Sequence, residues 1–422
     1  MNATYAARAA AGALAALLVL AGCSSKARNA DHGDGDKASA SPMKTGVGVS
    51  GKTITLGALT DMTGAYATLG KSVTQAQQLY VKQLNAAGGA CGYKVQLAIR
   101  DHGYDPQKAL SGYAELEPKV LGFVQFIGSP FVAAVQQRIH DHDKGLVLPQ
   151  TWSAALDGYY IRTIGSTYDM ETMNAIDFLM KEKGIKKGDR IGHVYVEGDY
   201  GEGALRGSKH VAQLYGLTVV EQKIKPTDND MTAQVAALRK AGVKAIVLSA
   251  GPRQAASLVG VAAAGGFDVP VIGNHSAFAP RLLATRAGPA LTRNYWVASP
   301  WLPIGADTPE AKKLVADYRA AYPKDALDND IVAGWIAASA FGEVLKRACA
   351  RKDLTREGVL SALPTTDSLD LGFGVVQGFT DFWGPSARAS VILRPDKSVT
   401  GGLRVVREPT VSEAASAYVD AD

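Results

Sequence analysis

Ser129 stands where a hydroxyl group and free backbone N–H groups can act together on a ligand. It follows the apolar run VLGFVQFIG and precedes Pro130, a residue favoured in the first turn of a helix. The first N–H groups of a helix have no partner within it, so they bind anions and carbonyl oxygens. Ser129 is therefore a candidate ligand-binding residue, although a serine that only caps the helix fits the same pattern.

Two short stretches gather side chains that bind metal ions, HGDGD at residues 32–36 and HDHD at residues 140–143. The first lacks the rest of a calcium loop. In the second, His140 and His142 are two residues apart and would point in different directions on a helix. The sequence also contains no G-x-S-x-G, no phosphate loop and no H-E-x-x-H. We therefore predict no catalytic residue, no metal site and no cofactor.

The N-terminal segment predicts export. The apolar run from Ala9 to Ala21 follows a single cation, Arg8, and is shorter than the roughly 20 residues that span a bilayer. Leu20-Ala21-Gly22-Cys23 resembles the bacterial lipobox, in which cleavage before the cysteine exposes a thiol for a lipid anchor. An ordinary signal peptide, with no role for Cys23, is the alternative. The lipobox reading predicts a palmitate-bearing lipoprotein on the outer face of the cell membrane.

Net charge and chain length indicate which partners and how many domains to expect in the rest of the chain. The formal net charge of +5 falls to +4 without residues 1–22, which indicates no basic stripe for a nucleic acid. Residues 23–50 are poor in large apolar residues and predict a flexible tether. The remaining chain is longer than one core usually organises, so we expect two domains.

Two cysteines remain beyond the lipobox, Cys91 and Cys349. Outside the cytoplasm such a pair is a disulfide candidate. Two separate buried thiols are the alternative.

Strands alternate with helices along the chain. KTITLGALT, KVQLAIRD, VLGFVQFIG and KGLVLP predict four strands, with helices after residue 70, after Asp105 and after Pro130. The order restarts near Ile191 with strands in RIGHVYVEG, LTVVEQ, KAIVLSAG and VPVIGN and helices over 202–215, 231–241 and 253–264. This pattern predicts two parallel α/β lobes, with a ligand site beyond the carboxyl ends of their strands.

Several segments, in this order, resemble the type I periplasmic-binding-fold substrate-binding proteins of ABC transporters, in the leucine/isoleucine/valine-binding branch. They are ITLGALTDMTGAYATLGKSV, LNAAGGACGYKVQLAIRDHGYDPQKAL, FIGSPFVAAVQ, VEGDYGEGALRG and VIGN. The resemblance implies two Rossmann-like lobes joined by a three-crossover hinge. It divides the chain into residues 51–167 plus 300–366 (lobe 1), residues 168–299 plus 367–406 (lobe 2) and a C-terminal tail, 407–422.

The resemblance also implies site residues. IGSPFVAA matches the loop that binds the ligand carboxylate, which supports Ser129, and PQTWSA matches a neighbouring ligand loop with Trp152 and Ser153. Tyr200 in DYGEG matches a tyrosine that covers the ligand, or it simply packs at a strand-to-helix turn.

Three further positions carry an alternative each. Tyr66 lies where the family often has an aromatic wall, although strict alignment places Leu69 there. Trp335 matches a tyrosine that faces the cleft, or it belongs to an apolar helix core. His275 stands where amino-acid-binding members have an acid for the ligand ammonium; a capping or surface histidine is its alternative. The missing acid disfavours an α-amino acid, because a buried ammonium without a carboxylate is costly. A small carboxylate, an amide, a polyol or an aromatic ring suits these groups better.

The sequence thus predicts a monomeric, non-enzymatic solute-binding protein that delivers a small ligand to an ABC permease. A ligand-sensing receptor subunit of the same fold and an exported enzyme are the alternatives.

Overall fold

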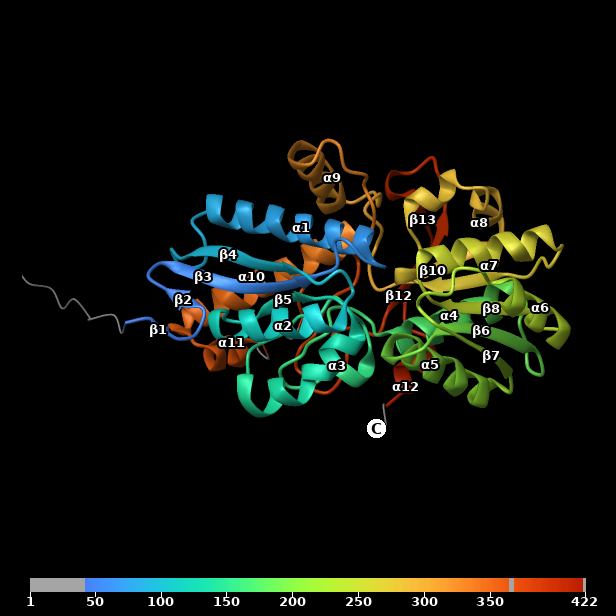
Figure 1. The fold of residues 1–422 in the computed structure, drawn as a ribbon, viewed down its shortest axis with the longest axis horizontal. Coiled ribbons are helices and arrows are strands. Elements are labelled where there is room, and N and C mark those ends of the chain that lie inside the picture. The colour runs from blue at the N-terminus through green and yellow to red at the C-terminus, as the bar shows by residue number, and fades with distance from the viewer. Residues whose placement is uncertain (1–41, 364–367, 420–422) are drawn as a thin grey trace, which may run out of the picture. The chain divides into compact units, whose positions relative to one another are not determined.

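The computed structural model describes residues 42–363 and 368–419. Two larger β-sheets, each covered by helices on both faces, form two lobes (Figure 1). A third, two-stranded sheet pairs β1 (Lys44–Thr45) with β11 (Asp353–Leu354). The predicted signal peptide and Cys23 lie outside the described residues.

Lobe 1 is built on a small sheet in which β3 is central. β3 pairs in parallel with β4 and β5 and antiparallel with β2. Helices α1, α9 and α10 lie on one side, and α2 and α3 lie on the other (Figure 1). The strands are β1 (Lys44–Thr45), β2 (Val49–Ser50), β3 (Thr53–Thr60), β4 (Lys94–Asp101), β5 (Phe123–Phe126) and β11 (Asp353–Leu354). The helices are α1 (Ala67–Ala86), α2 (Pro106–Leu116), α3 (Ser129–Arg138), α9 (Pro309–Ala321), α10 (Asp330–Ala350) and α11 (Arg356–Ala362).

Lobe 2 is built on a seven-stranded sheet of order β13-β12-β10-β9-β8-β6-β7. β12 pairs antiparallel with both of its neighbours, and the other strands run parallel. The strands are β6 (Arg190–Val196), β7 (Thr218–Ile224), β8 (Ala245–Ser249), β9 (Val271–Asn274), β10 (Tyr295–Ser299), β12 (Ser390–Pro395) and β13 (Leu403–Thr410). The helices are α4 (Tyr168–Lys183), α5 (Asp199–Tyr215), α6 (Thr232–Ala241), α7 (Pro252–Ala264), α8 (Gly288–Asn294) and α12 (Glu413–Ala417).

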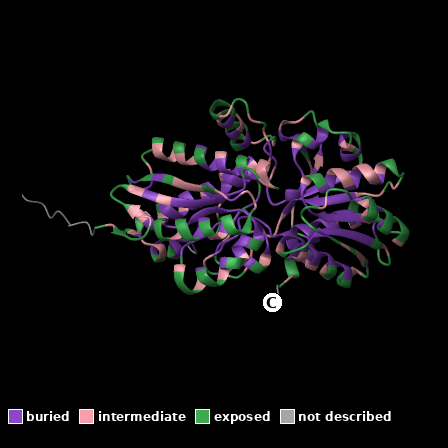
Figure 2. Ribbon diagram, in the orientation of Figure 1, coloured by how far each residue is buried: buried purple, intermediate pink, exposed green. Residues whose placement is uncertain are grey.

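The chain passes between the lobes three times, before α4, after β10 and after α11, as the family resemblance implies. The central strands are buried along their length (Figure 2). Continuous apolar runs such as AIVLS in β8 are typical of parallel strands that are covered on both faces.

Three predictions differ from the structure. The tether predicted to reach residue 50 ends earlier, because Lys44 and Val49 already lie in strands that pair through backbone hydrogen bonds. KGLVLP forms only isolated bridges at Val147, to Phe123 and Ile161, because its pairing is too short for a strand. The boundary after residue 406 falls inside β13, whose pairing with β12 continues to Thr410.

The two cysteines of the described residues lie together. Cys91, in the turn before β4, forms a disulfide with Cys349 near the end of α10, and their Cα atoms are 5.9 Å apart. The bridge ties the amino-terminal part of lobe 1 to a helix that the chain adds 258 residues later.

Candidate functional site

A cavity of about 340 Å³ lies where the two lobes meet. Most of its lining follows the carboxyl ends of strands from both sheets, where parallel α/β folds bind ligands. Its lining residues are Tyr66, Leu69, Tyr104, Ile127, Gly128, Ser129, Gln150, Thr151, Trp152, Tyr168, Tyr200 and Ser276. We call it the inner cavity.

Hydroxyl groups and a helix N-terminus form the polar end of the inner cavity. Gly128 adopts a φ of 106°, which favours glycine, and turns the chain from β5 into α3. Ser129 is the first residue of α3, and its hydroxyl is hydrogen-bonded to that of Thr151; both residues are buried. None of the described residues that line the cavity is Asp, Glu, Lys or Arg. This end can therefore bind a carboxylate through neutral donors.

Tyrosine rings form the walls. The rings of Tyr66 and Tyr104 lie 4.9 Å apart, and those of Tyr168 and Tyr200 lie 4.1 Å apart. The hydroxyl of Tyr200 donates to the carbonyl of Ala250, at 3.2 Å. Burial, with a smaller effect of Asp61, raises the pKa of Tyr66 to about 12, and burial raises the pKa of Tyr104 well above its usual value. These phenols stay neutral at physiological pH, so they suit an uncharged part of a ligand.

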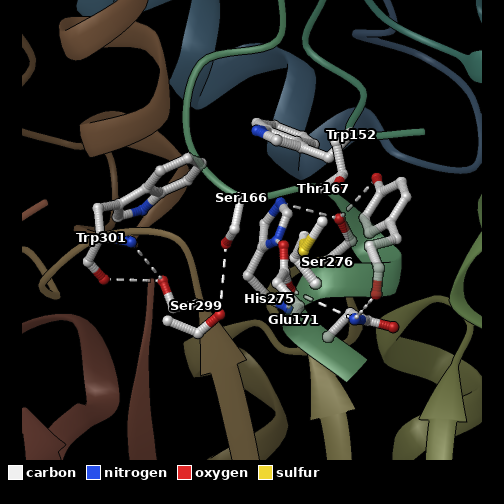
Figure 3. A network of polar contacts seen from close by, with 12 residues as sticks. Trp152, Ser166, Thr167, Glu171, His275, Ser276, Ser299 and Trp301 are labelled. Atoms are coloured by element: carbon white, nitrogen blue, oxygen red, sulfur yellow. Dashed lines mark hydrogen bonds and ion pairs between the residues drawn. The ribbon is translucent and has the colours of Figure 1, made fainter. Parts of the chain in front are cut away.

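His275 lies next to Trp152 (Figure 3). It is not among the residues that line the inner cavity. The two rings are 4.3 Å apart, edge to face. Both His275 Nδ1, at 2.8 Å, and the backbone N–H of His275, at 3.1 Å, contact the carboxylate of Glu171, which is fully buried. The imidazole instead lines a second cavity of about 320 Å³ with Trp301 and Asp330. His275 thus packs against Trp152 and makes two hydrogen-bond contacts with the carboxylate of Glu171.

The structure brings together four of the predicted site residues. Tyr66, Ser129, Trp152 and Tyr200 line the inner cavity. Ser153 is buried beside the cavity and donates to the backbone carbonyl of Asp199 in lobe 2, at 3.3 Å.

Trp335 lies elsewhere in lobe 1. On α10, it packs edge to face on Tyr80 of α1, with ring centroids 5.4 Å apart. It does not line the inner cavity.

The sequence reasoning missed Tyr104, Thr151, Tyr168, Ser276 and the buried Glu171. Two of these had a usable signal. Tyr104 follows the strand KVQLAIRD at its carboxyl end, and Thr151 stands between Gln150 and the predicted Trp152.

The described residues 42–363 and 368–419 contain no group of three or more His, Cys, Asp or Glu side chains that could hold a metal ion. In HDHD, the carboxylate of Asp143 accepts from Tyr113 at 2.7 Å and pairs with Arg138 at 3.0 Å. Within the same part of the chain, none of the helices combines the length and apolar character needed to cross a membrane.

Comparisons with solved structures place the fold among binding proteins. A fatty acid ABC transporter substrate-binding protein from Thermomonospora curvata is 50% identical, with 89% of this chain and 97% of that chain covered and a TM-score of 0.87. A branched chain amino acid ABC transporter protein from Thermus thermophilus with bound valine is 21% identical, with coverage of 87% and 98% and a TM-score of 0.76. The similarity to the Thermus thermophilus protein is a similarity of fold alone.

A curated relative, Leu/Ile/Val-binding protein homolog 3 from Brucella melitensis, is 25% identical over 198 residues, 46% of this chain. The match spans about half of that relative, 53% of its length. Residues 53–404 match the family described as periplasmic binding protein. Since this match extends over most of both lobes, the chain belongs to the periplasmic binding protein family.

Proposed function

We propose that this protein is the solute-binding component of an ABC transporter, and that it captures an aliphatic monocarboxylate, a fatty acid, outside the cytoplasm. The observation that carries the proposal is the composition of the inner cavity. Ser129, Thr151 and the N-terminus of α3 offer neutral donors at one end, and the tyrosine walls offer uncharged surface beside them. A carboxylate with an apolar chain matches both parts.

The relative that is 50% identical supports this ligand class, because it is described as a fatty acid binding protein.

A free α-amino acid fits the site less well. Its ammonium would need a carboxylate partner, and none of the residues that line the inner cavity is an acid. The nearby buried carboxylates already accept hydrogen bonds, that of Glu171 from His275 and that of Asp61 from backbone N–H groups. Burying an ammonium without such a partner costs several kcal/mol.

The test uses four probes of matched length on purified protein that begins after Cys23: hexanoate, norleucine, hexylamine and hexanol. Isothermal titration should show the tightest binding for hexanoate, with norleucine and hexylamine at least tenfold weaker. Native mass spectrometry of the same protein identifies any ligand retained from the cell. Norleucine binding as tightly as hexanoate would overturn the ligand class.

The proposal includes the membrane tether and excludes catalysis. Cys23 would carry the lipid that keeps the protein near its permease, and the protein would act as a monomer without chemical turnover of its ligand. A receptor subunit of the same fold would bind the same ligand, but its gene would lie apart from genes for a permease and an ATPase.

A further inference from the structure

We infer that Tyr66 limits the length of the aliphatic chain, because its side chain alone separates the inner cavity from a third cavity, the outer cavity, that opens toward solvent. This inference rests on the proposed function, because it concerns the chain of the bound carboxylate. Opening the wall would extend the site to longer fatty acids.

This outer cavity encloses about 670 Å³, which includes space open to solvent, and it also lies between the lobes. Its lining residues are Ala65, Tyr66, Pro226, Thr227, Asn229, Gly251, Pro252, Arg253, Gln254 and Arg281. Tyr66 is the single residue that the linings of the two cavities share.

The side chain of Tyr66 is held between the lobes. Its ring packs on Tyr104 in lobe 1, and a Cβ placed on Gly251 in lobe 2 would lie 3.9 Å from its Cε1 atom. The ring therefore lies between the lobes, where it borders both cavities.

The backbone at this position does not depend on the ring. The N–H of Tyr66 donates to the carboxylate of Asp61 at 2.7 Å, and Gly64 donates to the same carboxylate at 2.6 Å. Both bonds use main-chain groups, so they survive replacement of the side chain. Tyr66 precedes α1 and makes no side-chain cap to it.

The outer cavity can accept an alkyl chain. Ala65, Pro226 and Pro252 contribute apolar surface, and the long stems of Arg253 and Arg281 can cover a chain while their charged heads remain in water. With the carboxylate bound at Ser129, a longer chain would leave the inner cavity at Tyr66.

The experiment measures affinity for even-numbered straight-chain acids from butanoate to dodecanoate. Each methylene that becomes buried raises affinity about fourfold. For the unchanged protein we expect this rise to stop at a chain length that fills the inner cavity. For Tyr66→Ala the rise should continue by at least two further carbon pairs, about 16-fold per pair.

Two variants control for indirect effects. Tyr66→Phe keeps the ring and should keep the chain length at which the rise stops. Thr227→Trp fills the outer cavity. In the double variant Tyr66→Ala/Thr227→Trp, the acid chain length at which affinity stops rising should therefore return toward that of the unchanged protein. If Tyr66→Ala unfolds, Tyr66→Leu tests the same opening with a smaller loss of packing.

The outcomes separate the two claims. An identical stopping length in the unchanged protein, Tyr66→Ala and Tyr66→Leu would overturn the inference while short acids still bind. A continued rise through dodecanoate in the unchanged protein would also overturn it. Failure of every acid to bind any variant would overturn the proposed function and the inference with it.

Discussion

Ser129 shows how one residue combines a local and a tertiary role. Pro130 and Gly128 fix the start of α3, so the position of Ser129 follows from its own neighbours in sequence. Its partner Thr151 arrives from another segment, and the two hydroxyls meet inside the inner cavity. Because one of these hydroxyls donates to the other, a bound carboxylate would gain one hydroxyl donor from the pair and further donors from the helix N-terminus.

Replacement of Ser129 by alanine should weaken carboxylate binding by about 10- to 150-fold, since a hydrogen bond to a charged group contributes about 1.5–3 kcal/mol. Titration calorimetry with hexanoate measures the change. Trp335→Phe is the matched control, because Trp335 lies outside the inner cavity and should leave affinity unaltered. Unchanged affinity in Ser129→Ala would place the carboxylate elsewhere.

At the scale of elements, a chain of buried polar groups links three strands of lobe 2 near the site. His193 of β6 contacts Ser208 of α5 through Nδ1 at 2.8 Å and Ser249 of β8 through Nε2 at 2.9 Å. Ser249 donates to the side-chain oxygen of Asn274 in β9 at 2.6 Å. Because Ser249 uses its proton there, it accepts from the Nε2–H of His193, and in the neutral imidazole Nδ1 then accepts from the hydroxyl of Ser208.

This arrangement predicts that the free energy of unfolding decreases in acid. Burial, with a smaller effect of Lys209, lowers the pKa of His193 from 6.5 to about 3. Between pH 3 and pH 6.5, His193 therefore binds a proton in the unfolded chain but not in the folded protein. Stability contributed by His193 is full above pH 6.5 and falls by about 1.4 kcal/mol per pH unit as pH drops from 6.5 toward 3.

Chemical denaturation of the unchanged protein and His193→Gln between pH 7 and 4 measures this contribution. The free energy of unfolding should fall less steeply with acid in the variant. Burial raises the pKa of Asp157 to about 7, which gives the opposite slope, but Asp157 is present in both proteins and cancels in the difference. Parallel pH profiles would contradict the role of His193.

At the scale of the whole molecule, contacts across the cleft hold the lobes together. Arg281, in the short helix Pro280–Ala284 of lobe 2, donates to the hydroxyl of Thr68 on α1. Ser153 reaches the backbone of Asp199 in the opposite direction. Ligand contacts from both lobes would favour the same closed arrangement, so we expect capture and closure to be coupled.

Arg281→Ala should weaken hexanoate binding about fivefold, because one exposed hydrogen bond that forms on closure contributes about 1 kcal/mol. Arg286→Ala, an exposed arginine on the same segment, is the control. Small-angle scattering should show compaction of the unchanged protein with hexanoate and less compaction of Arg281→Ala. If bound hexanoate leaves the radius of gyration unchanged, closure does not accompany capture.

The proposed membrane tether gives a separate prediction. Cys23→Ala should abolish incorporation of a palmitate analogue and move the protein from the membrane fraction to the soluble exported fraction. Ligand affinity should not change, since the cavity lies within residues 66–276. Continued labelling of the variant would remove Cys23 as the lipid attachment site.

The sequence by itself determined the two alternating α/β lobes and the position of Ser129, because hydrophobic periodicity and the Gly-Ser-Pro turn are local properties. Only the tertiary structure decided which residues share the cavity. Glu171 and His275 are 104 residues apart and pair after α4 packs beside β9. The cavity forms only where loops from both sheets meet. Hydrophobic periodicity in the sequence indicates which face of a helix or strand is buried, but not which other element covers that face.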